Sequence, residues 1–227
     1  ERSNFDMLFL VDSLVGGTTP DQIRYAIQFP CHDPESLVTY LSAVVERLGF
    51  AVTMSTTFYP PFLLARTLAT LDHLTAGRIG WNIVSSISTA EAKNFGCVEL
   101  PEHDQRYDLA DEYMEACYAL WNCWDDDALV TDMEGKIIAH PEKVHRARFS
   151  GETYQTEGPF TVMPSPRRRP FLFQAGQSDR CRAFAARHAE GIFSAARGSR
   201  QMRAFSDDIA ARLDGEGRDP NKVPTFW

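Results

Sequence analysis

Three side chains that could bind an anion or move a proton lie close together in the middle of the chain. His103, Arg106 and Tyr107 stand at positions i, i+3 and i+4, which are neighbours on the surface of a helix. An imidazole, a guanidinium and a phenol can together hydrogen-bond an oxygen-rich ligand, and the histidine and tyrosine can also exchange protons. From spacing alone, a surface or capping role for His103 is the competing interpretation.

A second candidate site begins at a glycine. Gly176, Gln177 and Ser178 precede a predicted helix, and the first turn of a helix presents unpaired N–H groups and a partial positive charge. A glycine before that turn lets a phosphate approach the backbone closely. The sequence therefore predicts a phosphate site here, with a plain serine N-cap as the alternative.

Other polar residues follow buried, strand-like segments. Most of them are uncharged hydrogen-bonding groups, and they include no cluster of histidines and carboxylates that would hold a metal. They favour a polar heterocycle as the ligand, although ordinary turn chemistry would also place such residues at strand ends. The set comprises Asp12, Ser13, Thr56, Thr57, Asn82, Ser85, Ser86, Gln174 and Gln177.

Apolar patterning predicts the elements that position these residues. Continuous apolar runs indicate strands buried on both faces, and apolar residues at helical spacing indicate the helices between them. Helix-start signals such as Asp33–Pro34 and stop signals such as Gly77 mark several boundaries. The predicted strands are 5–11, 50–57, 78–86, 171–176, 191–195 and 223–227, and the predicted helices are 34–48, 61–75, 104–124, 178–189 and 199–213.

Strands that alternate with helices predict an α/β protein with a parallel sheet. An open doubly wound sheet loses its main support because no G-x-G-x-x-G motif follows a strand. The preferred architecture is a (β/α)8 TIM barrel, whose active site lies at the carboxyl ends of the strands. Six strands are visible, so we expect an incomplete barrel that lacks its first and last strands. We expect residues 1–227 to form one domain, with an insertion at about 125–166 that includes a hairpin near 149–160.

Composition excludes several classes of protein. A net charge of −8 and a pI near 5.2 argue against nucleic acid as a partner. No apolar stretch approaches the roughly 20 residues of a membrane span, and no signal peptide is visible. The five cysteines are expected to be free thiols because their spacing fits neither disulfides nor zinc. These features predict a cytoplasmic protein.

Several motifs, taken in order, resemble one enzyme family. The stretch from Gly77 to Ser86, followed by Asn94-Phe95-Gly96, is similar to a hallmark of the flavin-dependent monooxygenases of the nitrilotriacetate and dibenzothiophene-sulfone monooxygenase family, which have the barrel of the bacterial luciferase-like superfamily. The resemblance extends over nearly the whole chain. The other matching segments are Phe5-Asp6-Met7 with Asp12-Ser13, Ser55-Thr56-Thr57, Ala65-Arg66 to Leu74, His103-x-x-Arg106-Tyr107 with Glu112 and Leu120-Trp121, and Gln174-Ala175-Gly176-x-Ser178.

The resemblance implies an oxidoreductase that uses FMN in its reduced form, FMNH2, and O2 as co-substrate to oxidise a small organic molecule. A separate NAD(P)H:flavin reductase would supply the reduced flavin, and a homodimer or larger homo-oligomer is expected. The alternatives are a deazaflavin-dependent oxidoreductase on the same barrel and a catalytically inactive flavin-binding homologue. Carried over residue by residue, His103 and Tyr107 would be catalytic. The implied cofactor-binding residues are Asp12, Thr57, Asn82, His103, Tyr107, Gly176 and Ser178.

One position departs from the family pattern. Where many relatives have a small residue shortly after the phosphate-binding serine, this sequence has Cys181, flanked by Arg180 and Arg182. These side chains either tighten phosphate binding or crowd it.

Overall fold

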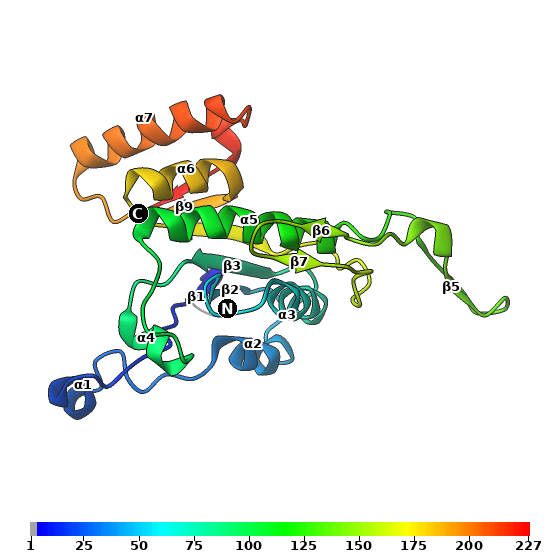
Figure 1. Ribbon diagram of the computed structural model, residues 1–227, viewed down its shortest axis with the longest axis horizontal. Helices are drawn as coiled ribbons and strands as arrows, with labels where there is room; N and C mark the ends of the chain where they lie inside the picture. The colour runs from blue at the N-terminus through cyan, green and yellow to red at the C-terminus, as the bar shows by residue number, and fades with distance from the viewer. Residues whose placement is uncertain (1–3) are drawn as a thin grey trace.

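The computed structural model describes residues 4–227 and contains a six-stranded, wholly parallel sheet with the strand order β1-β2-β3-β8-β9-β10 (Figure 1). The strands of this sheet are in the same order as in the chain, so each crossover connects two neighbouring parallel strands. All six predicted strands are present. They are β1 (Met7–Leu10), β2 (Gly49–Ser55), β3 (Ile79–Val84), β8 (Phe171–Ala175), β9 (Gly191–Phe193) and β10 (Thr225–Phe226).

Helices connect these strands and cover one face of the sheet (Figure 1). The predicted helices are all present, although the first ends at Ser42 and not near Leu48. The amides of Ala43 and Val44 donate to carbonyls three residues earlier, in place of the four of an α-helix, and the chain turns there. Two short helices, α1 and α4, were not expected. The helices are α1 (Pro20–Tyr25), α2 (Pro34–Ser42), α3 (Pro61–Leu74), α4 (Thr89–Asn94), α5 (His103–Trp121), α6 (Asp179–His188) and α7 (Ser199–Gly215), with short 3-10 turns at Pro141–Lys143 and Pro220–Lys222.

The sheet is strongly curled. Phe9 on the edge strand β1 has its ring centroid 4.5 Å from that of Phe193 on β9, four places away in the sheet. Glycines leave room for these rings: a Cβ on Gly80 would lie 2.7 Å from the Phe173 ring, and one on Gly191 would lie 2.9 Å from the Phe171 ring. Aromatic side chains therefore fill the concave face, as side chains fill the interior of a barrel.

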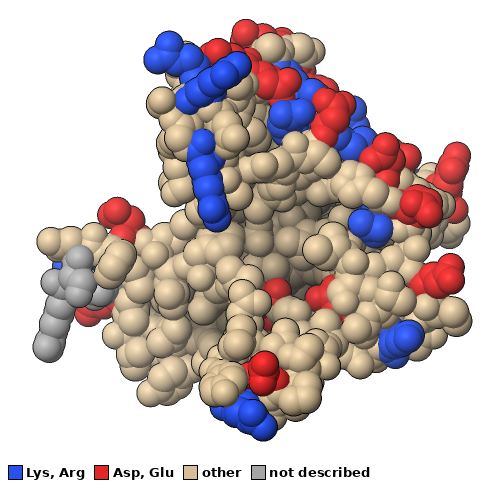
Figure 2. All heavy atoms as spheres, turned by 90° about the vertical axis from the view of Figure 1, so that its left-hand side faces the viewer, with Lys and Arg blue, Asp and Glu red and all other residues tan. Residues whose placement is uncertain are grey.

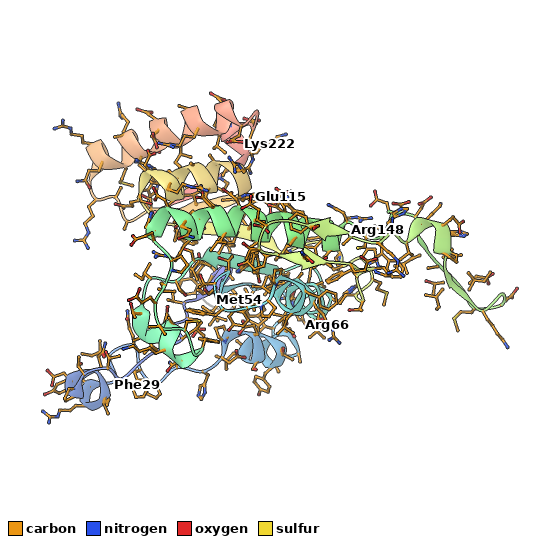
Figure 3. All side chains as sticks on the ribbon, viewed as in Figure 1. Phe29, Met54, Arg66, Glu115, Arg148 and Lys222 are labelled. Carbon is orange, nitrogen blue, oxygen red and sulfur yellow. The ribbon has the colours of Figure 1, made fainter. Side chains whose placement is uncertain are left out.

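The main hydrophobic core lies between the convex face of the sheet and the helices. Met54 of β2 is 2% exposed in this layer (Figure 3), and the side chain of Trp81 on β3 is fully buried. The indole of Trp81 donates to the Met54 carbonyl at 3.0 Å, so its polar atom is paired. A second cluster, which includes Ile192, Phe205 and Ile209, packs α6 and α7 against β9.

Within residues 4–227, β1 and β10 are the two edges of the sheet and do not pair with each other. The fold is therefore a parallel β/α half-barrel, in agreement with the predicted incomplete TIM barrel. All six strands point the same way, so their carboxyl ends share one side of the molecule, which is on the left in Figure 1.

The segment from 125 to 166 forms structure outside the six-stranded sheet. The predicted hairpin near 149–160 is present as β6 (Phe149–Ser150) paired with β7 (Gln155–Thr156). A second hairpin, β4 (Leu129–Asp132) with β5 (Ile137–Ala139), was not expected and extends away from the sheet on the right of Figure 1.

Two features bear on the predictions from composition. All five cysteines are free thiols; Cys31 and Cys97 are exposed, and the other three are buried. Within the described part of the chain, no helix combines the length and apolar character needed to cross a membrane.

Candidate functional site

A cleft of about 340 Å³ opens at the carboxyl ends of β1, β2, β3 and β8. Figure 2 views this side of the molecule and shows a central hollow. Three of the predicted site residues, Asp12, Asn82 and Tyr107, line the cleft. They come from the end of β1, the middle of β3 and the first turns of α5, so the fold brings together residues that are far apart in the sequence.

Asn82 contributes a buried acceptor that has no partner. Its side-chain nitrogen donates to the Thr53 hydroxyl at 3.0 Å, but its Oδ1 atom is buried and accepts no hydrogen bond from any residue between 4 and 227. Asn82 is only 5% exposed. A buried polar atom without a partner is costly, so this oxygen is available to a donor on a ligand in the cleft.

Asp12 sits in a loop that a second carboxylate holds in place. Glu91 of α4 accepts hydrogen bonds from the Leu14 amide at 3.2 Å and the Ser13 hydroxyl at 3.4 Å. Burial raises the pKa of Asp12, and the nearby negative charges of Asp33 and Glu91 raise it further, against a backbone hydrogen bond from Ser13. The sequence analysis missed Glu91 as a positioning residue; the Ser88-x-x-Glu91 pattern of a helix start was the available signal.

Tyr107 lies at the back of the cleft. The Gln174 amide donates to the Tyr107 hydroxyl at 3.4 Å. Burial raises the pKa of Tyr107 well above its ordinary value, with a further contribution from the neighbouring Cys181 thiol, while hydrogen bonds with Ser85 and Gln174 oppose the rise. The phenol is therefore neutral at physiological pH and can donate or accept a hydrogen bond.

Thr57 contacts a residue that lines the cleft, although it does not line the cleft itself. Its hydroxyl donates to the carbonyl of Ser85 at 2.7 Å, and Ser85 lines the cleft. Thr57 itself faces a neighbouring pocket. The structure thus places Thr57 at the border between the two cavities.

His103 and Ser178 meet on the α6 side of the cleft. The His103 Nε2 atom lies 3.2 Å from the Ser178 hydroxyl, and its Nδ1 atom lies 2.6 Å from the Asp104 carboxylate. Ser178 is also the N-cap of α6, since its hydroxyl oxygen accepts from the Cys181 amide at 3.2 Å. The exposed imidazole and the amino end of α6 form a place where an anion would meet N–H donors and positive partial charge.

Gly176 lies directly over the buried Cys181 side chain, just before α6. Its φ of +146° favours glycine, and an added Cβ would lie 2.3 Å from the Cys181 sulfur and 4.0 Å from the Tyr107 hydroxyl. The His103 and Tyr107 rings have centroids 5.2 Å apart. His103, Tyr107, Gly176 and Ser178 therefore form one connected group.

Arg106 does not join this group, contrary to the expectation from its spacing. Its Nη1 atom donates to the Pro101 carbonyl at 2.6 Å, and the side chain lines the neighbouring pocket. The reason is that α5 packs Tyr107 toward β8 and α6, which turns the preceding residue toward the 97–101 loop.

Cys181 and its two arginine neighbours have contacts within the protein. Cys181 is 2% exposed and its sulfur accepts from the Gln174 amide at 3.2 Å, so the thiol packs beneath Gly176. Arg180 pairs with Asp108 and Asp111, and Arg182 with Asp208. Both guanidiniums therefore take part in ion pairs on the outer helices.

A second buried carboxylate near Asp12 was not anticipated. Burial raises the pKa of Glu35 on α2 to about 8, and the neighbouring acids Asp33 and Asp12 raise it further. Within residues 4–227, neither buried carboxyl oxygen has a hydrogen-bond partner. No sequence signal marked Glu35, because its burial depends on the packing of α2 against α3 and β2.

Among residues 4–227, no three or more His, Cys, Asp or Glu side chains are arranged to hold a metal ion. The half-barrel and its cleft define a class: β/α barrel proteins that bind an organic ligand at the carboxyl ends of their strands. The family model for luciferase-like monooxygenases matches residues 1–226. The chain belongs to this family.

Relatives with established names support the assignment. The chain is 44% identical to the dibenzothiophene-sulfone monooxygenase of Rhodococcus erythropolis over 232 residues, which cover 100% of this chain and 51% of that protein. It is 34% identical to nitrilotriacetate monooxygenase component A of Aminobacter aminovorans over 231 residues, covering 98% and 51%. The chain thus spans about half the length of the curated relatives it matches.

Solved structures give the same result. The crystal structure of the long-chain alkane monooxygenase LadA is similar with a TM-score of 0.93 at 44% identity, covering 99% of this chain and 53% of that one. The riboflavin lyase RcaE, solved with modified FMN and riboflavin, has a TM-score of 0.94 at 36% identity, covering 100% and 52%. Coenzyme F420-dependent enzymes at 14% and 15% identity share the fold alone.

Proposed function

We propose that this chain is the FMN-binding part of a two-component monooxygenase that uses reduced FMN and O2 to oxidise a small organic molecule. The single observation that carries the proposal is the shared cleft: it holds Asn82, with its unpaired buried oxygen, next to Tyr107, which connects to the open amino end of α6 at Ser178. FMN has a polar ring at one end and a phosphate at the other, and these two parts of the site match them.

The phosphate half of the site would consist of Ser178, His103 and Gly176. The hydroxyl and imidazole are 3.2 Å apart, and α6 presents its first N–H groups beside them. Gly176 lets the backbone run directly over the Cys181 side chain into α6, because any Cβ at this position would strike the sulfur. These residues would bind and orient the phosphate, and His103 could hold a proton at Nε2.

The ring half would consist of Asn82, Asp12 and Thr57, with Tyr107 between the two halves. The Asn82 Oδ1 atom accepts hydrogen bonds only, so it would pair with an N–H group of the ring. The neutral Tyr107 phenol would hold a proton close to the reacting oxygen.

Bound reduced FMN would supply the electrons that activate O2. Because a relative is named component A of a monooxygenase, we propose that a separate NAD(P)H:flavin reductase supplies FMNH2. We also propose a cytoplasmic location and assembly into a homodimer or larger homo-oligomer. The relatives named above act on chemically different molecules, so the proposal extends to a small organic substrate and not to one compound.

The phosphate half can be tested with two flavins. Ser178→Ala should weaken FMN binding by about tenfold or more, the effect of losing a hydrogen bond to a charged group, and should leave riboflavin binding unchanged. Thr19→Ala is the matched control, because it removes the N-cap of α1 outside the cleft. Equal losses for FMN and riboflavin would refute the phosphate assignment.

The reaction class needs a separate test. Reduced FMN is titrated anaerobically into the full-length protein, and oxygen is then added in a stopped-flow spectrometer. Tight binding followed by a transient change in flavin absorbance supports the monooxygenase. Failure to bind reduced FMN, or hydride transfer with a deazaflavin in its place, would overturn it.

A further inference from the structure

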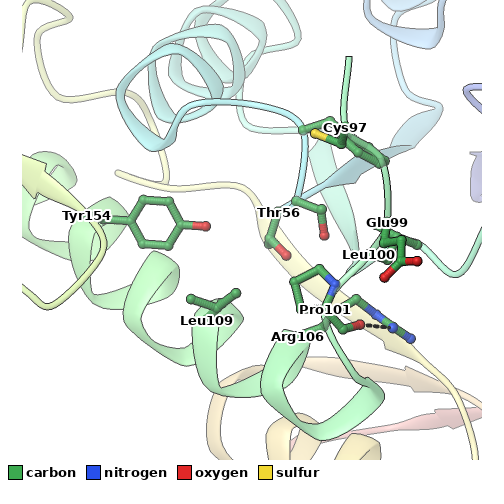
Figure 4. A pocket seen from close by; sticks show the side chains of 10 residues that line it. Thr56, Cys97, Glu99, Leu100, Pro101, Arg106, Leu109 and Tyr154 are labelled. Atoms are coloured by element: carbon green, nitrogen blue, oxygen red, sulfur yellow. Dashed lines mark hydrogen bonds between the residues drawn. The ribbon is translucent and has the colours of Figure 1, made fainter. Parts of the chain in front are cut away.

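A second pocket lies beside the cleft, between the first turns of α5 and the loops around it. It encloses about 290 Å³, which is large enough for a small organic molecule. Its walls come from the end of β2, the 97–101 loop, α5 and the β6–β7 hairpin (Figure 4). The lining residues are Thr56, Thr57, Phe58, Cys97, Glu99, Leu100, Pro101, Arg106, Leu109 and Tyr154.

Arg106 gives this pocket a positive charge whose hydrogen-bonding capacity is only partly used. One guanidinium nitrogen donates to the Pro101 carbonyl, and the Nε atom is buried with no acceptor. Within residues 4–227 no ion pair to Arg106 is formed. A guanidinium in a fixed position favours a carboxylate, which can accept two parallel N–H donors.

The rest of the lining suits an apolar body. Leu100, Pro101 and Leu109 supply aliphatic surface, and the Tyr154 hydroxyl points into the space (Figure 4). Glu99 is the opposing feature, because it brings a negative charge to the same pocket. It is exposed, so solvent screens its charge more than that of the partly buried guanidinium.

We propose that this pocket binds a small organic carboxylate with an apolar body, its carboxylate paired with Arg106 and its body against Leu100, Pro101 and Leu109. The site is separate from the cleft proposed for FMN. The hydrogen bond between Thr57 and Ser85 lies between the two cavities. It does not depend on the proposed function.

Two exposed cysteines provide an internal comparison for the test. Cys97 lines the pocket and Cys31 does not. The alkylation rate of each thiol by iodoacetamide is measured by peptide mass spectrometry, with benzoate as the probe and benzamide as its uncharged counterpart. Benzoate should slow alkylation of Cys97 and leave Cys31 unchanged, and benzamide should have a much weaker effect. Equal protection of both cysteines, or equal protection by both probes, would overturn the proposal.

Substitutions then test the pairing itself. Arg106→Gln should weaken benzoate binding by about tenfold or more, as expected for loss of a charge-assisted contact, and Glu99→Gln should strengthen it. Because Arg106→Gln also removes a contact to Pro101, Leu109→Trp serves as a second variant: it should block the pocket without changing charge. Unchanged protection of Cys97 in Arg106→Gln and Leu109→Trp would refute the site.

The separation from the cleft is tested by repeating the protection assay with saturating FMN. Benzoate should still protect Cys97. Loss of that protection on adding FMN would show that the two ligands share one site and would overturn the proposal of a separate pocket.

Discussion

Two stretches of α5 differ in whether the polar groups around them have partners within the protein. In the middle of α5, Asp111 lies 2.5 Å from Arg180 and 2.8 Å from His188. At its first turns, Tyr107 faces a cleft in which Asn82 keeps an unpaired buried oxygen. The first arrangement joins α5 to α6, and the second leaves hydrogen-bonding groups free for a ligand.

The pKa shifts follow the same division. Burial acts to raise the pKa of Asp111, but hydrogen bonds and charges from His188 and Arg180 bring it below its ordinary value. Burial raises the pKa of Asp12, which lines the cleft, and of Glu35 on α2, with no cation to oppose either shift. Asp111 is thus paired where α5 packs on α6, whereas Asp12 is left uncompensated where a cofactor is proposed to bind, a pattern typical of functional sites.

The largest expected effect is on the paired side. Asp111→Ala removes the carboxylate that pairs with both buried His188 and partly buried Arg180, so it should lower the free energy of unfolding by about 3 kcal/mol, as for other broken buried ion pairs. Chemical denaturation measures the change. Asp108→Ala is the matched control, because Asp108 also pairs with Arg180 but its side chain is 70% exposed, and it should cost less than about 1 kcal/mol. Equal costs would remove the distinction between the two stretches.

The stability of the protein should depend on pH through Glu35 of α2. Burial raises the pKa of Glu35 from its ordinary value of 4.5 to about 8 in the folded protein. The folded state therefore holds an extra proton between these values, and stability falls as pH rises through this window, by up to about 1.4 kcal/mol per pH unit. Glu35→Gln cannot titrate, so its stability should change less between pH 5 and pH 8. Parallel stability curves for the two proteins would contradict the raised pKa.

A smaller effect is expected for ligand binding at Asn82. Asn82→Ala removes an acceptor that the protein itself does not use, so it should weaken FMN binding by about tenfold, which corresponds to about 1.4 kcal/mol. Fluorescence titration measures the affinity. Asn122→Ala, at the far end of α5 and exposed, is the control. Unaltered affinity in Asn82→Ala would place the flavin ring elsewhere.

The smallest stability change is expected at His103. Its imidazole is 45% exposed and contacts only Asp104 and Ser178 through polar atoms, so His103→Ala should alter the free energy of unfolding by less than about 0.5 kcal/mol. The yield of oxidised product per reduced flavin should nevertheless fall. Normal yield and normal flavin affinity together would remove His103 from the mechanism.

Local signals predicted much of this fold. Asp33 and Pro34 start α2, and Ser178 caps α6, as their types and positions indicated. The short helix α1 was missed although Thr19 and Gln22 form a capping box. Six residues are too few for a periodic apolar face, and none of them is buried.

The site was harder to predict because it depends on contacts between distant segments. Strand ends placed Asp12, Asn82 and Gly176 on one side of the molecule, as expected for parallel strands. The direction of the Arg106 side chain and the burial of Glu35 depend on how helices and loops pack against one another. The spacing of residues along a helix does not predict this packing. The Ser88-x-x-Glu91 pattern marked the start of α4, but the contact of Glu91 with a loop 77 residues away in the sequence could not be predicted from it.

The two missing side chains at Gly80 and Gly191 set the radius of the sheet, because the phenylalanine rings occupy the space that Cβ atoms would need. Both glycines sit nearer the amino ends of their strands than the cleft does. An alanine at either position would have to displace the phenylalanine ring that faces it. The curvature of the sheet and the packing of aromatic rings on its concave face can therefore be altered only together.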